Sequence, residues 1–453
     1  METWKKFKKV NLNKINLKNV SIFLLILLPF AIILGQAPSD IIVSTISILF
    51  LINSTIQKDW SWTKKKWIKI IFFLWIYLIL ASFFALDIKI ALEHSILFVR
   101  FFIFAIAIQY WVLSNEKHLN TVLYSLLIAF FFIFIDTFYQ FINFDSSKGY
   151  GPDLLGYYSN DHFRLTGPFR SNIPGAYLSK FFFILFLFIL IKLGKSNKYS
   201  FLFTFILSST FFLVFLTGEA MSFASMGLGL IILFFFERKF RKKIFLSLCF
   251  VFFFILLTIK YNPIWNKIEI IEKNPWHNGT IYQLDIPCED NKNQICKKKF
   301  KTQPFFYEVL NNFEKSAYWE TYKQALTIWR DYPIFGIGIK NYTNACKLEK
   351  YKENLKYFFC TTHPHNFYIQ WLLETGILGL FGFIILLFIW SKHFINIIEK
   401  NTSPLIYSPI LSLIVLFWPI MSTGSFFSNR NATMNWFIIA LCLAITNLKK
   451  KKA

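Results

Sequence analysis

The chain has 453 residues, of which 55% are hydrophobic, 20% aromatic and only 16% charged, and its mean hydropathy is +0.47. Soluble globular proteins carry about 25% charged residues, and this composition excludes disordered, collagen-like and small disulfide-framework classes. We therefore expect an all-α, polytopic integral membrane protein. The net charge of +24 does not indicate nucleic-acid binding. The lysines cluster in short loops and at both ends of the chain, where they orient helices in a bilayer.

Twelve apolar stretches are candidates to cross the roughly 30 Å hydrocarbon core. They lie at 19–35, 41–56, 68–86, 89–113, 119–142, 173–193, 200–217, 222–237, 243–260, 376–391, 404–423 and 432–448. The second and eighth are short. The first is not a cleavable signal peptide, because no small-residue cleavage site follows it. We expect one polytopic domain over residues 1–453, without an internal repeat or a second soluble domain.

The positive charges predict the orientation of these spans. When spans are counted alternately, four basic segments fall on one side, at residues 5–14, 64–66, 238–243 and 449–452. Lys/Arg-rich loops stay in the cytoplasm, so both termini are predicted to be cytoplasmic. The loops at about 143–172 and 261–364 then face outward.

The large outer loop, 261–364, predicts one helix and two disulfides. Residues 317–332 have an amphipathic pattern, since Trp319, Tyr322, Leu326 and Trp329 recur at helical spacing. In an oxidising compartment its four cysteines favour two local bridges, with a bridge between Cys296 and Cys346 as the alternative. The expected pairs are Cys288–Cys296 and Cys346–Cys360.

A histidine and an amide stand at the start of a predicted outer helix. His363, His365 and Asn366 precede a mostly apolar run, and Gly376 and Gly379 follow it. Paired glycines allow another helix to pack closely. A solvated loop histidine beside a helix cap is an equally weighted interpretation. Two histidines separated by one proline make a poor metal site, because no third ligand is near.

Three arginines are candidates for binding an anionic substrate. Arg164 and Arg170 flank a Gly-Pro pair just before the sixth span, and Arg can bind phosphate through two parallel hydrogen bonds; snorkelling to the membrane surface is the alternative. Arg100 lies within the fourth span, where Asp136 is its expected partner, with Gln140 one turn away. We weigh a structural ion pair slightly above a substrate contact for Arg100.

Several segments together resemble the bacterial O-antigen ligase and O-antigen polymerase superfamily. His365-Asn366, nine residues, then Gly376-x-x-Gly379 is similar to that family's signature. Further segments resemble it in the family's order, over about residues 90–430: Asp136–Gln140, Arg164–Gly167, Thr217-Gly218-Glu219, Pro333–Gly338 and Gly424–Phe427. The sequence has no Asp-x-Asp motif and no Walker phosphate loop.

The resemblance implies an inverting, metal-independent glycosyltransferase without a cofactor, which acts in lipopolysaccharide or other surface polysaccharide biosynthesis. Its donor would be a glycan on undecaprenyl pyrophosphate at the periplasmic face of the bacterial inner membrane. A saccharide or lipid A core would be the acceptor, and a chain-length regulator a further partner. His365 matches the family's essential histidine, and Glu219 is the second catalytic candidate. The substrate-binding candidates are Arg164, Arg170, Arg100, Asn366 and Arg430.

The sequence departs from the family's pattern at two places. Ala220 follows Glu219 where the family often has an arginine, and before the loop helix Lys315 is the nearest cation. Either Arg164, Arg170 and Arg430 rebuild the phosphate site, or activity is impaired. The alternatives to a transferase are a transporter or flippase of lipid-linked saccharides and a non-catalytic assembly protein. Polymerase and ligase differ in their acceptor and are not separated by the sequence.

Overall fold

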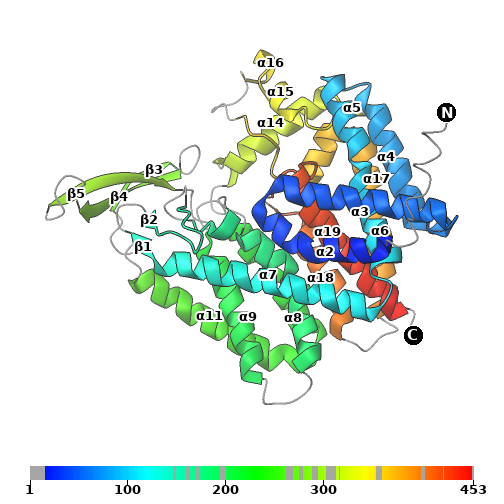
Figure 1. Ribbon diagram of the computed structural model, residues 1–453. Helices are drawn as coiled ribbons and strands as arrows, with labels where there is room; N and C mark the ends of the chain where they lie inside the picture. The colour runs from blue at the N-terminus through cyan, green and yellow to red at the C-terminus, as the bar shows by residue number, and fades with distance from the viewer. Residues whose placement is uncertain are drawn as a thin grey trace, which may run out of the picture.

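The computed structural model describes residues 16–145, 149–159, 164–169, 174–193, 200–261, 269–274, 279–287, 294–302, 313–315, 317–352, 360–398, 404–421 and 423–450. Most of these residues are helical, and the helices pack side by side into one bundle (Figure 1). The main apolar helices are α2 (Leu17–Leu34), α3 (Gln36–Ile56), α4 (Lys66–Ser82), α5 (Ile88–Leu97), α6 (Val99–Ala107), α7 (Glu116–Ile142), α8 (Pro174–Leu193), α9 (Ser200–Leu216), α10 (Ala220–Phe236), α11 (Arg241–Tyr261), α17 (Phe367–Ile398), α18 (Tyr407–Phe417) and α19 (Asn429–Lys450).

Each predicted apolar stretch overlaps a helix, although 68–86 and 404–423 extend past the ends of α4 and α18, and the all-α polytopic class is confirmed. Within the described residues, eight helical segments are long and apolar enough to cross a membrane, while α9, α10 and α18 are shorter apolar helices. The stretch 89–113 is divided into α5, α6 and the π-helical turn η4 (Ile108–Val112). Helix α18 ends before Trp418, because a residue that precedes a proline disfavours helical backbone. The number of twelve crossings therefore stays a prediction.

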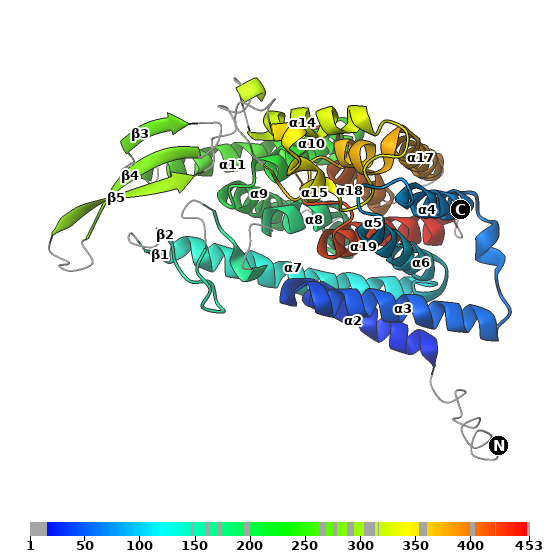
Figure 2. The ribbon, with the colours of Figure 1, turned by 90° about the horizontal axis from the view of Figure 1, so that it is seen from above.

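The first and last described helices meet on one side of the bundle. Lys18 of α2 donates a 2.6 Å hydrogen bond to Ser114 Oγ, and Lys449 of α19 pairs with Glu116 of α7 at 3.1 Å. Figures 1 and 2 place the start of α2 and the end of α19 on the opposite side of the bundle from the strands β3–β5 (Glu269–Asn274, Gly279–Pro287 and Ile295–Thr302). This arrangement agrees with an even number of crossings, and we call the side of the strands the outer side. The compartment that it faces stays a prediction.

Two small antiparallel sheets in the outer loops were not expected from the sequence. Strand β1 (Phe144–Asp145) pairs with β2 (Gly149–Tyr150). Strands β3 (Glu269–Asn274), β4 (Gly279–Pro287) and β5 (Ile295–Thr302) pair in the order β3-β4-β5, with Ile286 opposite Cys296. These strands stand out from the helical bundle in both views.

The amphipathic helix of the large loop is confirmed as α14 (Ala317–Asp331), which packs on α17. Its most buried stripe is displaced by one position from the predicted aromatic stripe. Thr321, Ala325 and Ile328 are buried, whereas the predicted aromatic residues are half-buried. Small side chains at the contact let the two helices approach closely, and the larger aromatic residues then flank the contact.

Two short helices and a disulfide follow α14 in the large loop. They are α15 (Tyr342–Cys346) and α16 (Glu349–Lys352). The predicted Cys346–Cys360 disulfide is present, and it closes this segment beside the start of α17. Cys296 is also disulfide-bonded; its predicted partner Cys288 lies outside the described residues.

Candidate active site

His363 and His365 form a tight turn at the outer start of α17. His365 has a φ of +56°, which non-glycine residues rarely adopt. The backbone of Thr423 holds this turn in place. Its N–H donates to the His365 carbonyl oxygen at 2.9 Å, and its carbonyl oxygen lies 3.0 Å from His363 Nε2. The two imidazole rings lie 4.2 Å apart. A strained backbone that its surroundings hold in place is a recurrent feature of functional sites.

Both imidazoles are neutral at neutral pH. Burial lowers the pKa of His363 to about 4, and the neighbouring His365 lowers it further. Burial also lowers the pKa of His365. A carbonyl oxygen can only accept, so His363 carries its proton on Nε2 and its Nδ1 accepts from Thr362 Oγ1 at 2.9 Å. A neutral His365 can accept a proton from a substrate hydroxyl.

Helix α14 covers this turn from the outer side. The Tyr318 ring meets the His365 ring edge-on, with centroids 6.0 Å apart. One turn along α14, Tyr322 Oη donates to the Met421 carbonyl oxygen at 3.0 Å. Burial raises the pKa of Tyr322 to about 12, so this phenol remains a hydrogen-bond donor. The helix therefore joins the histidine turn to the connection between α18 and α19.

Asn366 was predicted as a substrate contact, and in the structure both ends of its side-chain amide form hydrogen bonds within the protein. Its Oδ1 accepts from the N–H groups of Tyr368 and Ile369 at 2.9 and 3.2 Å, which is an N-cap for α17. Its Nδ2 donates to the Pro419 carbonyl oxygen at 2.8 Å. Both ends of the amide thus fix the start of α17 directly after His365.

A buried polar network behind the histidine turn was missed by the sequence analysis. Gln370 Nε2 donates to Glu374 Oε1 at 3.1 Å and to Ser425 Oγ at 2.7 Å, and its Oε1 accepts from the Phe426 N–H at 2.8 Å. Glu374 Oε2 accepts from the Lys340 N–H at 3.0 Å. Polar residues at i and i+4 inside an apolar helix were the available signal.

The two glycines of the signature have different roles, and the predicted close packing of another helix is seen at Gly379. Gly376 does not provide a helix-packing face; it breaks α17, with φ +68° and ψ −176°. The segment 333–338 inserts at this break, where Ile377 N–H donates to the Pro333 carbonyl oxygen at 2.9 Å. A Cβ built on Gly336 would lie 2.5 Å from Gly376 N, so both positions require glycine. Gly379 lies against Tyr77 of α4.

A second cluster gathers Arg164 and Glu219 at the outer end of α8. Arg164 Nη2 lies 3.5 Å from the Gly218 carbonyl oxygen and acts electrostatically on the Glu219 carboxylate. That carboxylate also accepts from the Ala176 N–H and from Ser222 Oγ. A Cβ on Gly175 would lie 2.5 Å from Glu219 Oε2, so α8 approaches the carboxylate closely. Burial raises the pKa of Glu219 to about 7, although Arg164 opposes that rise.

The remaining arginines have separate positions. The Arg430 guanidinium lies over the Phe169 ring at 5.6 Å, and Phe169 follows Arg164 in the same outer segment. Arg430 therefore approaches the Arg164 cluster from the start of α19. Arg170 lies outside the described residues, and its binding role stays a prediction.

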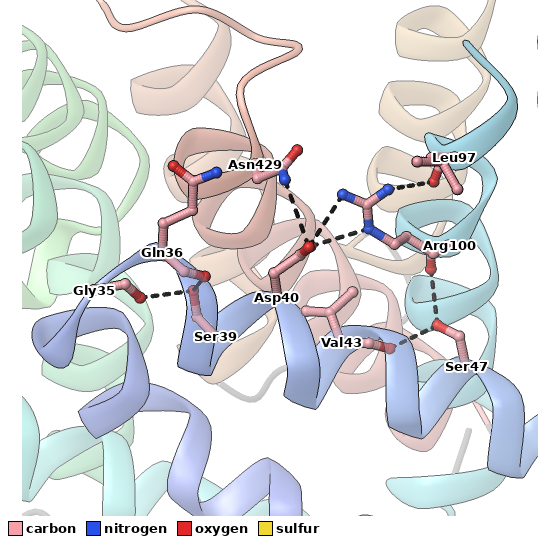
Figure 3. Close-up of polar contacts among 9 residues, drawn as sticks. All are labelled: Gly35, Gln36, Ser39, Asp40, Val43, Ser47, Leu97, Arg100 and Asn429. Atoms are coloured by element: carbon pink, nitrogen blue, oxygen red, sulfur yellow. Dashed lines mark hydrogen bonds and ion pairs between the residues drawn. The ribbon is translucent and has the colours of Figure 1, made fainter. Parts of the chain in front are cut away.

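The expected pair of Arg100 with Asp136 is wrong. Arg100 Nε bonds Asp40 Oδ1 of α3 at 3.0 Å, and Asn429 at the start of α19 also approaches Asp40, at 3.5 Å (Figure 3). Asp136 instead accepts from the Leu154 N–H at 2.9 Å. The Arg100 pair therefore joins α3, α6 and α19, as the structural interpretation expected.

Gln140, near the polar end of α7, forms hydrogen bonds to the outer segment that carries Arg164. Its Oε1 accepts from the N–H groups of Thr166 and Gly167 at 2.8 and 3.0 Å. The end of α7 therefore holds the outer segment that carries Arg164. Within the described residues, no three His, Cys, Asp or Glu side chains cluster closely enough for a metal ion.

Comparison with known proteins supports the family suggested by the sequence. Residues 203–384 match the family model described as O-antigen ligase. The matched segment begins in α9 and includes Glu219, α14, the histidine turn and the break at Gly376. No curated protein matches the sequence. Residues 203–384 of this multi-pass membrane protein are therefore similar to the O-antigen ligase family, and this match supports the superfamily of O-antigen ligases and polymerases.

Proposed function

We propose that the protein transfers a glycan from undecaprenyl pyrophosphate to a saccharide acceptor at the periplasmic face of the bacterial inner membrane. The observation that carries this proposal is the neutral His365, held in a strained turn under α14 at the outer end of a membrane helix. A neutral imidazole there can meet an acceptor hydroxyl from outside and a donor from the bilayer. Chain-length regulators would be further partners.

An apolar cavity supports a lipid-linked donor. It has a volume of about 730 Å³ and lies between α10, α17 and α18. Tyr368 at the outer start of α17 and Ile398 at its inner end both line it. Tyr368 is three residues from His365, so a polyprenyl chain in this cavity would have its diphosphate end near the histidine turn.

The proposed chemistry is a single displacement that inverts the anomeric carbon. The acceptor oxygen bonds to that carbon while the carbon–oxygen bond to pyrophosphate breaks, and the pyrophosphate leaves with the electron pair. The acceptor proton passes to His365. Arg164 and Arg430 would stabilise the negative charge that develops on the leaving group, which is the role that a metal ion has in other transferases. No metal or other cofactor is part of this proposal.

Transfer by protein in lipid nanodiscs tests the proposal. The substrates are an undecaprenyl-pyrophosphate-linked oligosaccharide and either a second lipid-linked chain or lipid A core. We expect His365→Ala to reduce transfer by about 10²–10⁴-fold, as the loss of a general base does. His118→Ala at the start of α7 is the matched control and should keep the parent's rate. Parent-like transfer by His365→Ala would contradict the proposal.

The same variant separates a transferase from a transporter. In sealed vesicles, a transporter would move the lipid-linked oligosaccharide across the bilayer without forming a glycosylated acceptor. Movement of donor that survives in His365→Ala, with no transfer by the parent, would favour the transporter. The acceptor that is consumed distinguishes a polymerase, which uses the second lipid-linked chain, from a ligase.

A further inference from the structure

Lys180 is a buried cation in the middle of an apolar helix. It lies in α8, where the residues that follow it are phenylalanine, leucine and isoleucine as far as Lys192, and only 7% of the residue is exposed. Its Nζ lies 3.5 Å from Oδ1 of Asn435, a fully buried residue of α19. An ionisable group inside a membrane helix is costly unless it has a partner, and such groups usually mark functional sites.

The geometry of α8 directs Lys180 toward Glu219. Ala176 lies one turn before Lys180 on the same helix face, and its N–H donates to the Glu219 carboxylate. Helical side chains point back toward the N-terminus, so the Lys180 side chain extends toward the turn of α8 that contacts the carboxylate. The two groups interact electrostatically. Among the described residues, Arg164 and Lys180 are the charged groups that act on Glu219.

We propose that Lys180 is the buried counter-ion of Glu219 and a positioning residue of the anion site. The neutral Asn435 cannot balance its charge, whereas the carboxylate can. Arg164, Glu219 and Lys180 together then carry one net positive charge for an anionic ligand. Lys180 of α8 is then the second cation of this site beside Arg164, and the link to phosphate rests on the proposed function.

A stability cycle tests the pairing without any activity measurement. The proteins are Lys180→Met, Glu219→Gln and the double variant, each purified in the same detergent and unfolded by heat. Glu219→Gln leaves the lysine buried beside neutral groups only, so it should lower the thermal midpoint. Adding Lys180→Met should recover at least half of that loss. Additive losses would overturn the proposal, since independent sites add. Lys192→Met, at the exposed end of α8, is the matched control and should recover nothing.

The ionisation of Glu219 gives a second readout. The protonated carboxyl band of Glu219, identified by its loss in Glu219→Gln, can be followed by infrared spectroscopy across pH. An opposite charge nearby lowers a carboxyl pKa, so Lys180→Met should raise the titration midpoint. Lys180→Arg should leave it close to the parent's value. An unchanged midpoint in a folded Lys180→Met protein would overturn the proposal.

These outcomes are separable from those of the transferase proposal. If the parent does not transfer glycan but the cycle shows coupling, the counter-ion assignment stands and the proposed function fails. If the parent transfers glycan and the cycle is additive, Lys180 has no such role and the proposed function stands. If both stand, Lys180→Met should weaken donor binding, seen as a raised KM, more than Lys180→Arg does.

Discussion

Acidification should destabilise the histidine turn, and the protonation of His363 should account for a calculable part of the lost stability. Its pKa is about 4 in the folded protein, against about 6.5 when unfolded. A folded-state pKa below the unfolded value means that the unfolded chain binds the proton first as pH falls. Stability is therefore complete above pH 6.5 and is lost progressively between pH 6.5 and 4. With these two pKa values, the free energy of unfolding is about 2.5 kcal/mol lower at pH 4.5 than at neutral pH.

His363→Gln isolates this contribution. A glutamine amide can still donate to the Thr423 carbonyl oxygen, as His363 Nε2 does, but it does not titrate. Free energies of unfolding would be measured in mixed detergent micelles at pH 7.5 and pH 4.5. The parent should lose about 2.5 kcal/mol more than the variant between these values. Equal losses would refute the reasoning, because the other groups that titrate in this range, including the neighbouring His365, are present in both proteins.

Three further predictions concern Arg164, Arg100 and Gly376. Arg164→Lys should impair transfer nearly as much as Arg164→Ala in the nanodisc assay, because bidentate geometry is lost; parent-like activity of the lysine variant would indicate snorkelling. Arg100→Met should lower the free energy of unfolding by roughly 3 kcal/mol, since it leaves the half-buried Asp40 carboxylate with the neutral Asn429 amide but without an opposite charge, and Asp40→Asn in the same chain should recover much of that loss. Gly376→Ala should lower the free energy of unfolding by at least about 3 kcal/mol, because the backbone conformation of Gly376 suits only glycine and a Cβ would lie 2.6 Å from Phe335 N. Gly227→Ala in α10 is the control. The added Cβ meets no atom closer than 3.4 Å, so this variant should be neutral or slightly stabilising.

The positions of the membrane helices could be predicted because the signal is local. A run of apolar residues must be helical to satisfy its backbone in lipid, whatever lies beside it. Even the break in α17 lies close to the point where the predicted span began, at residue 376. Helix ends were less predictable, since they depend on turns such as the one at Trp418 before Pro419.

Helix neighbours could not be predicted, and the partner of Arg100 shows why. Asp136 lies within the fifth predicted span and was taken as the possible partner. The true partner, Asp40, lies one residue before the predicted start of the second span and was assigned to a loop. One helix can pack beside several others, and a single sequence does not specify which of them.

The candidate site was predicted in part. His365 and Arg164 were found from short motifs, because those residues stand at the ends of spans. Lys180, Gln370 and Glu374 were missed, although each is a polar or charged residue inside an apolar run. That pattern is itself a signal for function. Asn366 shares a motif with His365, yet its contacts fix the helix start, and a motif does not distinguish these roles.

The connection between α18 and α19 explains how distant motifs form one site. Thr423 clamps the histidine turn, and Ser425 joins the network behind it. Six residues after Thr423, Asn429 reaches the Asp40 pair, and Arg430 then lies over Phe169 beside the Arg164 segment. One short segment thus contacts both the proposed base and the proposed anion site. Because the residues of this segment contact different helices, a shift of α19 would move the proposed base relative to the proposed anion site.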